Sequence, residues 1–217
     1  MGEVKKEDRV LLVVANLATG GDERFQKLYE WLDANAVVVA KLLVGAQYRQ
    51  IETLSGDDVT STNFVDRLTN LAAEPETKAI DVFLVLHAFP GVLIFDDRPV
   101  ATSELKQQIQ AANLGGKLRL LYSVACYGAT HARDFVDAGF RVASGSLGAN
   151  ANGPYDYPTQ LLHWRNCDTY RLAVNRGNNP LFKAIHDTFA QAMGFDDVNS
   201  EKVIEGKKLT RIDSEAI

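Results

Sequence analysis

Four mostly apolar runs, separated by helix-like segments, constrain this sequence more than any other feature. They are Val10–Ala15, Val37–Val44, Asp81–Leu86 and Leu118–Val124. The runs are rich in β-branched residues and do not alternate with polar ones, which is typical of strands covered on both faces. Strands that alternate with amphipathic helices build α/β folds. The sequence therefore predicts a three-layer α/β sandwich with a central, mainly parallel sheet of five or six strands.

The rest of the chain predicts smaller elements around that sheet. A hairpin with an acidic turn is expected at Val92–Val100, and a fifth strand at Phe140–Ser144. A loop rich in Gly, Asn, Pro and Tyr is expected from Gly145 to Pro158, and Val203–Ile212 is compatible with an edge strand. Asn179 followed by a proline predicts the start of a last helix. That helix should present an apolar face made of Leu181, Ile185, Phe189 and Met193.

Length and composition indicate one ordinary soluble domain. The chain has 217 residues, 46% of them hydrophobic, which suits a single domain spanning residues 1–217. A formal net charge of −5 without a Lys/Arg cluster argues against nucleic acid as a partner. No apolar stretch is long enough to cross a membrane, and acidic residues before the first run argue against a signal peptide. Oligomeric state stays open.

Cysteine and histidine usage limits the chemistry further. Only two cysteines occur, Cys126 and Cys167, which favours a reducing, cytoplasmic location, although a disulfide between them stays open. The four histidines and two cysteines match no metal-ligand spacing, so no metal is expected. Thr19-Gly20-Gly21 matches neither nucleotide-binding fingerprint, so no cofactor is expected.

Two of the predicted strands end in reactive side chains. The third apolar run is followed directly by His87, and the fourth leads through Ala125 to Cys126. Active groups of parallel sheets collect at the carboxyl ends of strands. An imidazole beside a thiol can act as its base, so we expect a partly ionised Cys126 paired with His87. The small residues Ala125 and Gly128 are expected to leave room for a substrate beside the sulfur.

These motifs resemble those of the caspase-like (clan CD) cysteine peptidases, which include caspases, metacaspases, legumain and gingipains. The segment Val124-Ala125-Cys126-Tyr127-Gly128 shares Ala, Cys and the final Gly with the caspase signature. His87 lies 39 residues before Cys126 (126 − 87), compared with about 50 in caspases. The resemblance spans roughly residues 10–146. It implies hydrolysis of a peptide bond in a peptide or protein substrate.

The resemblance also implies roles for individual residues. Cys126 would be the nucleophile, and His87 would protonate the departing amine and position the hydrolytic water. The backbone N–H groups of Cys126 and Ala88 would hold the oxyanion. Asp156, in the loop after the fifth strand, could line the pocket for a Lys or Arg side chain of the substrate.

Ala88 departs from the family pattern, which has glycine after the histidine. An alanine resists some backbone angles that glycine adopts, so the oxyanion site could be incomplete. A first alternative is therefore a catalytically inactive caspase-like module that binds a partner. A second alternative is a small α/β-hydrolase with Cys126 as nucleophile and a later histidine, His163 or His186, as base. His131 is interpreted as a surface residue.

Overall fold

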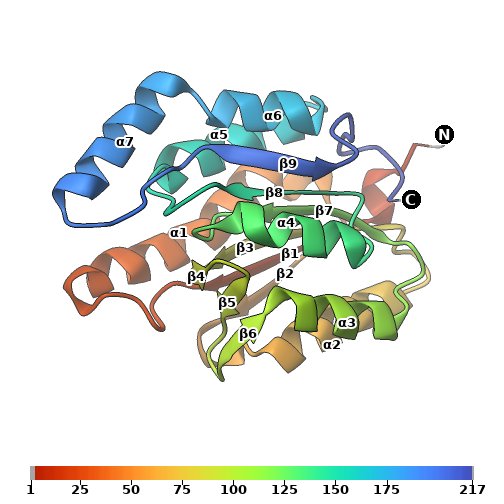
Figure 1. Ribbon diagram of the computed structural model, residues 1–217. Helices are drawn as coiled ribbons and strands as arrows, with labels where there is room; N and C mark the ends of the chain where they lie inside the picture. The colour runs from red at the N-terminus through yellow and green to blue at the C-terminus, as the bar shows by residue number, and fades with distance from the viewer. Residues whose placement is uncertain (1–2, 217) are drawn as a thin grey trace.

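Six strands form one central sheet in the order β2-β1-β3-β7-β8-β9 (Figure 1). The computed structural model describes residues 3–216. The strands are β1 (Arg9–Asn16), β2 (Gln50–Ser55), β3 (Ala79–Leu86), β7 (Leu118–Ser123), β8 (Val142–Ser146) and β9 (Lys202–Gly206). The first five run parallel, and β9 pairs antiparallel with β8. This is the mainly parallel sheet that the sequence predicts.

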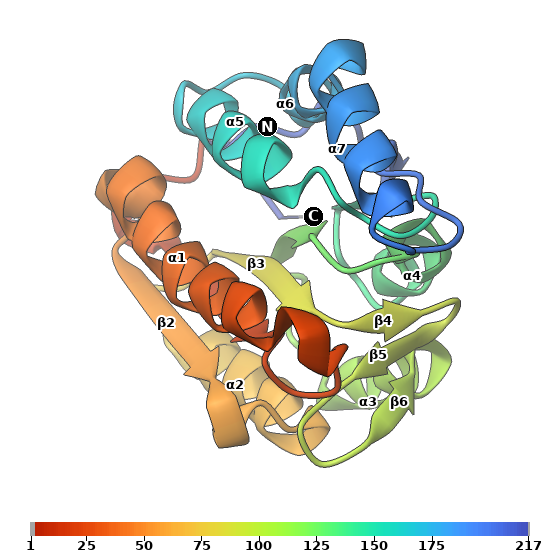
Figure 2. The same cartoon turned by 90° about the vertical axis from the view of Figure 1, so that its left-hand side faces the viewer.

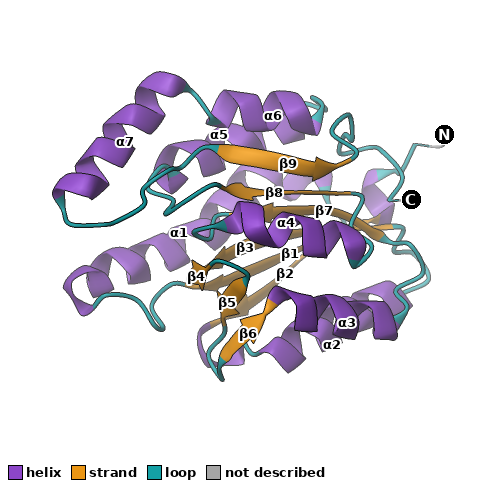
Figure 3. Cartoon of the chain, in the orientation of Figure 1, coloured by secondary structure: helices purple, strands orange, loops and turns teal. Residues whose placement is uncertain are grey.

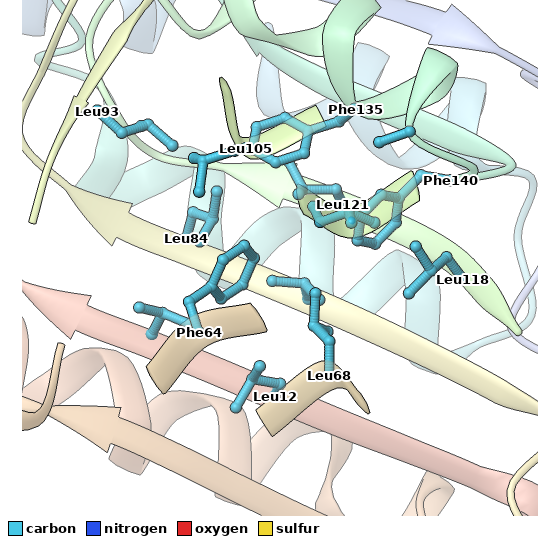
Figure 4. Close-up of a cluster of buried hydrophobic side chains, with 14 of the residues drawn as sticks. Leu12, Phe64, Leu68, Leu84, Leu93, Leu105, Leu118, Leu121, Phe135 and Phe140 are labelled. Carbon is cyan, nitrogen blue, oxygen red and sulfur yellow. The ribbon is translucent and has the colours of Figure 1, made fainter. Parts of the chain in front are cut away.

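Helices cover both faces of the sheet and complete a three-layer sandwich (Figure 3). The covering helices are α1 (Gln26–Val44), α2 (Ser61–Ala73), α3 (Thr102–Ala112), α4 (Gly128–Asp137), α5 (Gly153–Arg165) and α6 (Tyr170–Gly177), while α7 (Pro180–Ala192) contributes no buried residue. On one face, side chains of α2, α3 and α4 interdigitate with those of the strands, as Phe64, Leu84 and Leu121 do in Figure 4. A second core lies between the other face and α1, α5 and α6. The predicted fold class is therefore confirmed.

A small antiparallel sheet follows β3 of the central sheet almost directly in the chain. It contains β4 (Ala88–Phe89), β5 (Val92–Ile94) and β6 (Pro99–Ala101), in that order. The hairpin predicted at Val92–Val100 is thus present, with β4 as an added strand. Because β4 begins one residue after His87, the small sheet fixes the course of the chain beside that histidine.

Three of the four predicted apolar strands are confirmed, and the prediction of a strand at Val37–Val44 is wrong. Every residue of β1, β3 and β7 is buried. The run Val37–Val44, however, is the second half of α1. Its Ala40 and Val44 face the sheet, whereas Leu42 is 75% exposed, so the residues share a helical rather than a two-sided pattern. The second strand is the edge strand β2, whose half-buried polar residues give no apolar signal.

The segment after β8 also differs from the prediction. The expected loop ends early, because α5 begins at Gly153 with Pro154 in its first turn, where a missing N–H costs nothing. The helix predicted after Asn179 is confirmed as α7, and Asn179 caps it by accepting hydrogen bonds from two backbone N–H groups. Its apolar face is turned outward, since Leu181 and Phe189 are each 65% exposed.

No helix within residues 3–216 combines the length and apolar character needed to cross a bilayer. The cytoplasmic location expected from cysteine usage stays a prediction.

Candidate active site

His87 and Cys126 leave the central sheet at the same edge. His87 follows the last residue of β3, and Cys126 comes three residues after the end of β7. The two strands are parallel neighbours, and the Val124 N–H still donates to the Leu84 carbonyl oxygen at 2.8 Å. Neighbouring strands lie about 4.8 Å apart, so the two segments emerge side by side. Figure 2 looks onto this edge, with α1 on one side of the end of β3 and α7 on the other.

A backbone carbonyl fixes the orientation and the tautomer of His87. Its Nε2 lies 2.7 Å from the Leu17 carbonyl oxygen, in the segment after β1. A carbonyl oxygen only accepts hydrogen bonds, so Nε2 carries the proton and Nδ1 keeps the lone pair of a base. The ring also packs edge-on against Tyr29 of α1, with centroids 4.6 Å apart. Burial lowers the pKa of His87, although the Leu17 hydrogen bond and the Asp33 charge oppose the change.

The glycine-rich segment after β1 covers His87 closely. A Cβ on Gly21 would lie only 2.5 Å from Nε2 of His87 and would also overlap the Tyr29 ring. Any side chain at position 21 would therefore displace the imidazole. The Thr19-Gly20-Gly21 segment thus closes over the histidine, which explains the glycine at position 21.

Asn150 holds the turn that carries Cys126. Its backbone N–H donates to the Cys126 Sγ at 3.4 Å, and its side-chain Nδ2 donates to the Val124 carbonyl oxygen at 2.7 Å. Burial raises the pKa of Cys126, while the Asn150 N–H and the positive charge of Lys202 lower it to a lesser degree. The resting thiol is therefore neutral at neutral pH, and the expectation of a partly ionised thiol is not supported.

Tight packing surrounds the residues after Cys126. Tyr127 adopts a left-handed conformation (φ 53°) and donates its N–H to the Gly148 carbonyl oxygen at 2.8 Å. A Cβ on Gly128 would lie 2.7 Å from Cα of Gly145, so the backbones of α4 and β8 are in direct contact. The space at Gly128 is thus filled by β8. The prediction that Gly128 leaves room for a substrate is therefore not supported.

Ala88 sits in an ordinary strand conformation in β4. The Ile94 N–H donates to the His87 carbonyl oxygen at 3.0 Å, so His87 and Ile94 form a hydrogen-bonded pair. Hydrogen-bonded and non-hydrogen-bonded pairs alternate in antiparallel strands, so the next pair, Ala88 and Leu93, exchanges no hydrogen bonds. The Ala88 N–H consequently points away from β5. Any residue type adopts this extended conformation, so the strain expected from replacing glycine by alanine does not arise.

Asp156 lies inside the protein rather than in an open loop. It belongs to α5, is 1% exposed, accepts a hydrogen bond from the Tyr122 hydroxyl at 2.7 Å, and pairs with Lys202 Nζ at 3.2 Å. Its charge is already matched by an internal lysine. The predicted role of Asp156 in binding a substrate side chain therefore finds no support in its surroundings.

The remaining histidines and Cys167 occupy separate environments. His131 is fully buried in α4 and bonds through Nε2 to the Phe89 carbonyl oxygen at 2.9 Å, so its interpretation as a surface residue is wrong. His163 pairs with Asp168 at 2.8 Å, and His186 bonds to the Asn152 side chain at 2.7 Å. Cys167 and Cys126 are both free thiols, and no disulfide joins them.

Neither histidine after the nucleophile completes the hydrolase alternative. In that fold an acid precedes the histidine along the chain, whereas Asp168 follows His163. His163 also lies ten residues after the first residue of α5, which places it about 15 Å along the helix axis from the amino end beside Asn152. His186 has an amide, not a carboxylate, on its Nδ1.

Sequence reasoning missed the residues that hold His87 and Cys126 in place. Leu17 acts through its backbone, Tyr29 lies on a helix whose extent was mispredicted, and Asn150 reaches Cys126 across 24 positions of sequence. None of these carries a local motif. Within residues 3–216, no group of three or more His, Cys, Asp or Glu side chains is arranged to hold a metal ion. No family model matches the chain, and no curated protein sequence matches it.

Proposed function

We propose that this protein is a caspase-like cysteine endopeptidase, with Cys126 as nucleophile and His87 as general acid–base. The observation that carries the proposal is the emergence of both residues from neighbouring parallel strands, with His87 fixed by Leu17 in the tautomer whose Nδ1 is a base. They follow the third and fourth strands of the central sheet in chain order, which is the arrangement that the family resemblance implies.

The proposed reaction proceeds through a thioester. The Cys126 sulfur attacks the carbonyl carbon of the scissile bond, its proton passing to His87. The carbon–nitrogen bond then breaks, and the departing amine takes that proton from the histidine. Water, activated by His87, hydrolyses the thioester and regenerates the thiol. The N–H groups of Ala88 and Cys126 are the proposed donors to the oxyanion.

The protonation of the resting site sets a requirement on this reaction. Burial raises the pKa of Cys126 and lowers that of His87, so both are neutral before substrate binds. Proton transfer from sulfur to imidazole must therefore accompany the attack, as a general base provides. The raised pKa of Cys126 leaves the sulfur in its less nucleophilic thiol form. It is therefore also the observation that favours the second candidate, an inactive caspase-like module that binds a peptide without cleaving it.

A peptide library separates the two candidates. The purified protein would be incubated with fluorogenic peptides that vary at the residue before the cleaved bond, beside Cys126→Ala and His87→Gln. We expect cleavage by the wild type only. Cys167→Ala is the matched control, because Cys167 bonds to Asp213 and lies outside the proposed site. Absence of cleavage across the library, with peptides still bound, would favour the binding module.

A further inference from the structure

The peptide group between Leu17 and Ala18 has charged and polar partners on both of its sides. Its carbonyl oxygen, which belongs to Leu17, lies 2.7 Å from His87 Nε2. Its N–H, which belongs to Ala18, donates to Oδ2 of Asp33 at 2.9 Å. The C=O and N–H of a trans peptide point in opposite directions, so the carboxylate, the peptide and the imidazole form one continuous chain.

Asp33 is held firmly in this position. Besides the Ala18 N–H, it accepts the Leu17 N–H with both carboxylate oxygens at 2.8 Å. The residue lies on α1, one turn after Tyr29, the ring that packs on His87. A single helix thus supplies both the aromatic contact and the carboxylate behind the histidine.

We propose that Asp33 is a positioning residue for His87, acting through the single peptide group that joins Leu17 to Ala18. A hydrogen bond to a carboxylate polarises the peptide, and linked hydrogen bonds strengthen one another. The Leu17 carbonyl oxygen becomes a better acceptor for Nε2–H, and most of all when the imidazole becomes positively charged during proton transfer. Asp33 therefore stabilises the charged histidine without touching it.

The surroundings of His87 make Asp33 the charge to test. Tyr29 of α1 packs on the ring, and the charge of Asp33, also on α1, acts on it. Asp22 and Arg24 lie farther out, where they act on the Tyr29 hydroxyl. Of these groups, Asp33 is the charged side chain that raises the pKa of His87.

The first measurement follows the ring resonances of His87 by NMR during a pH titration. Asp33→Asn keeps the shape of the side chain and removes its charge, and should lower the pKa of His87 by about half a unit or more. Asp33→Glu should restore much of the difference. Asp97→Asn is the matched control, because Asp97 also accepts a backbone N–H, from Ser61, but has no connection to His87. An unchanged His87 pKa in folded Asp33→Asn overturns the proposal.

A second measurement uses the wild type alone and so does not depend on whether the variants fold. The Ala18 amide resonance should titrate with the same apparent pKa as the His87 ring, because one peptide group joins them. An Ala18 amide chemical shift that does not change over the pH range in which His87 titrates overturns the proposal.

The inference rests on the catalytic role proposed for His87, but its failure is distinguishable from failure of that role. If the wild type cleaves peptides, Asp33→Asn should lower kcat about tenfold, leave KM unchanged, and shift the acidic limb of the pH profile downward with the His87 pKa. If no peptide is cleaved but the His87 pKa falls in Asp33→Asn, the positioning role stands and the peptidase proposal fails.

Discussion

Two buried ion pairs lie at opposite ends of the sheet, and they are built differently. At the amino end, Asp81 of β3 and Arg119 of β7 form a two-pronged pair, with N–O distances of 2.9 and 2.7 Å. Tyr48 donates to the same carboxylate at 2.5 Å, and the remaining guanidinium nitrogen reaches the Ile212 carbonyl oxygen. Every charged atom of this pair has a close partner.

At the carboxyl end, Asp156 and Lys202 meet through one contact of 3.2 Å. The lysine shares its charge with the Ser123 carbonyl oxygen at 3.0 Å, and its field reaches the thiol of Cys126. The amino-end pair is closed and lies at the other end of the sheet from the candidate site, whereas the carboxyl-end pair is looser and electrostatically linked to Cys126. We infer that the first stabilises the fold and that the second also tunes reactivity.

The largest expected effect is therefore at the amino end. Arg119→Met leaves the Asp81 carboxylate buried without its cation, which should lower the free energy of unfolding by about 3–5 kcal/mol. Urea denaturation measures the loss. Arg133→Met is the matched control, because Arg133 forms an exposed pair with Asp137 and should cost about 1 kcal/mol or less. Equal losses in the two variants would contradict the stabilising role of the buried pair.

A smaller loss of stability, with a change in reactivity, is expected at the carboxyl end. Lys202→Met removes the partner of Asp156, but burial already raises the pKa of that carboxyl group, so it can take up a proton. The expected cost is about 2–3 kcal/mol. Removing the positive charge should also raise the pKa of Cys126 and slow its alkylation by iodoacetamide about threefold.

Lys183→Met is the control for this comparison, because Lys183 pairs with Glu201 at 2.9 Å on the surface. It should change neither stability nor labelling. Folded Lys202→Met with wild-type labelling kinetics would remove the distinction drawn between the two ends of the sheet.

The sequence indicates the ion pair at the amino end of the sheet, but only some of the residues that make up the carboxyl end. Asp81 and Arg119 each interrupt an apolar run, and a charged residue in a buried strand requires a partner, so their pairing was within reach. His87 and Cys126 were predicted from their places after apolar strands. The residues that support them could not be predicted, because Leu17 acts through its backbone and Lys202 approaches from β9, 76 positions after Cys126.

The mispredicted strand at Val37–Val44 has a related cause. Its β-branched residues favour a strand locally, but the packing of Ala36, Ala40 and Val44 on the sheet decides for a helix. That helix brings Tyr29 and Asp33 to His87. Tyr29 and Asp33 lie in the first half of this helix, which helical spacing over residues 22–34 does predict; their contacts with the segment after β1 and with His87 carry no such signal.

Acid should affect the carboxyl end through His131. Burial lowers the pKa of His131, whose Nδ1 is buried and lacks a hydrogen-bond partner. The unfolded chain binds a proton near pH 6.5 more readily than the folded one, so stability should fall as pH drops below about 6.5. His131→Gln, which can still donate to the Phe89 carbonyl oxygen, should remove about 1 kcal/mol of the loss between pH 7.5 and 5.5.

Urea denaturation at the two pH values provides this measurement. His87, whose pKa is also lowered by burial, should account for part of the remaining dependence on pH. Identical pH dependence in His131→Gln and the wild type would show that His131 takes no part.

The smallest effect is expected at Ala88, next to the histidine. Because Ala88 is in an extended strand and its N–H already points away from β5, glycine offers no conformation that the chain lacks. Ala88→Gly should lower stability by about 0.5–1 kcal/mol through the greater freedom of the unfolded chain. It should not increase peptide cleavage. A marked increase would mean that the working conformation of the carboxyl edge differs from the one described, and that alanine at position 88 holds the site in a resting state.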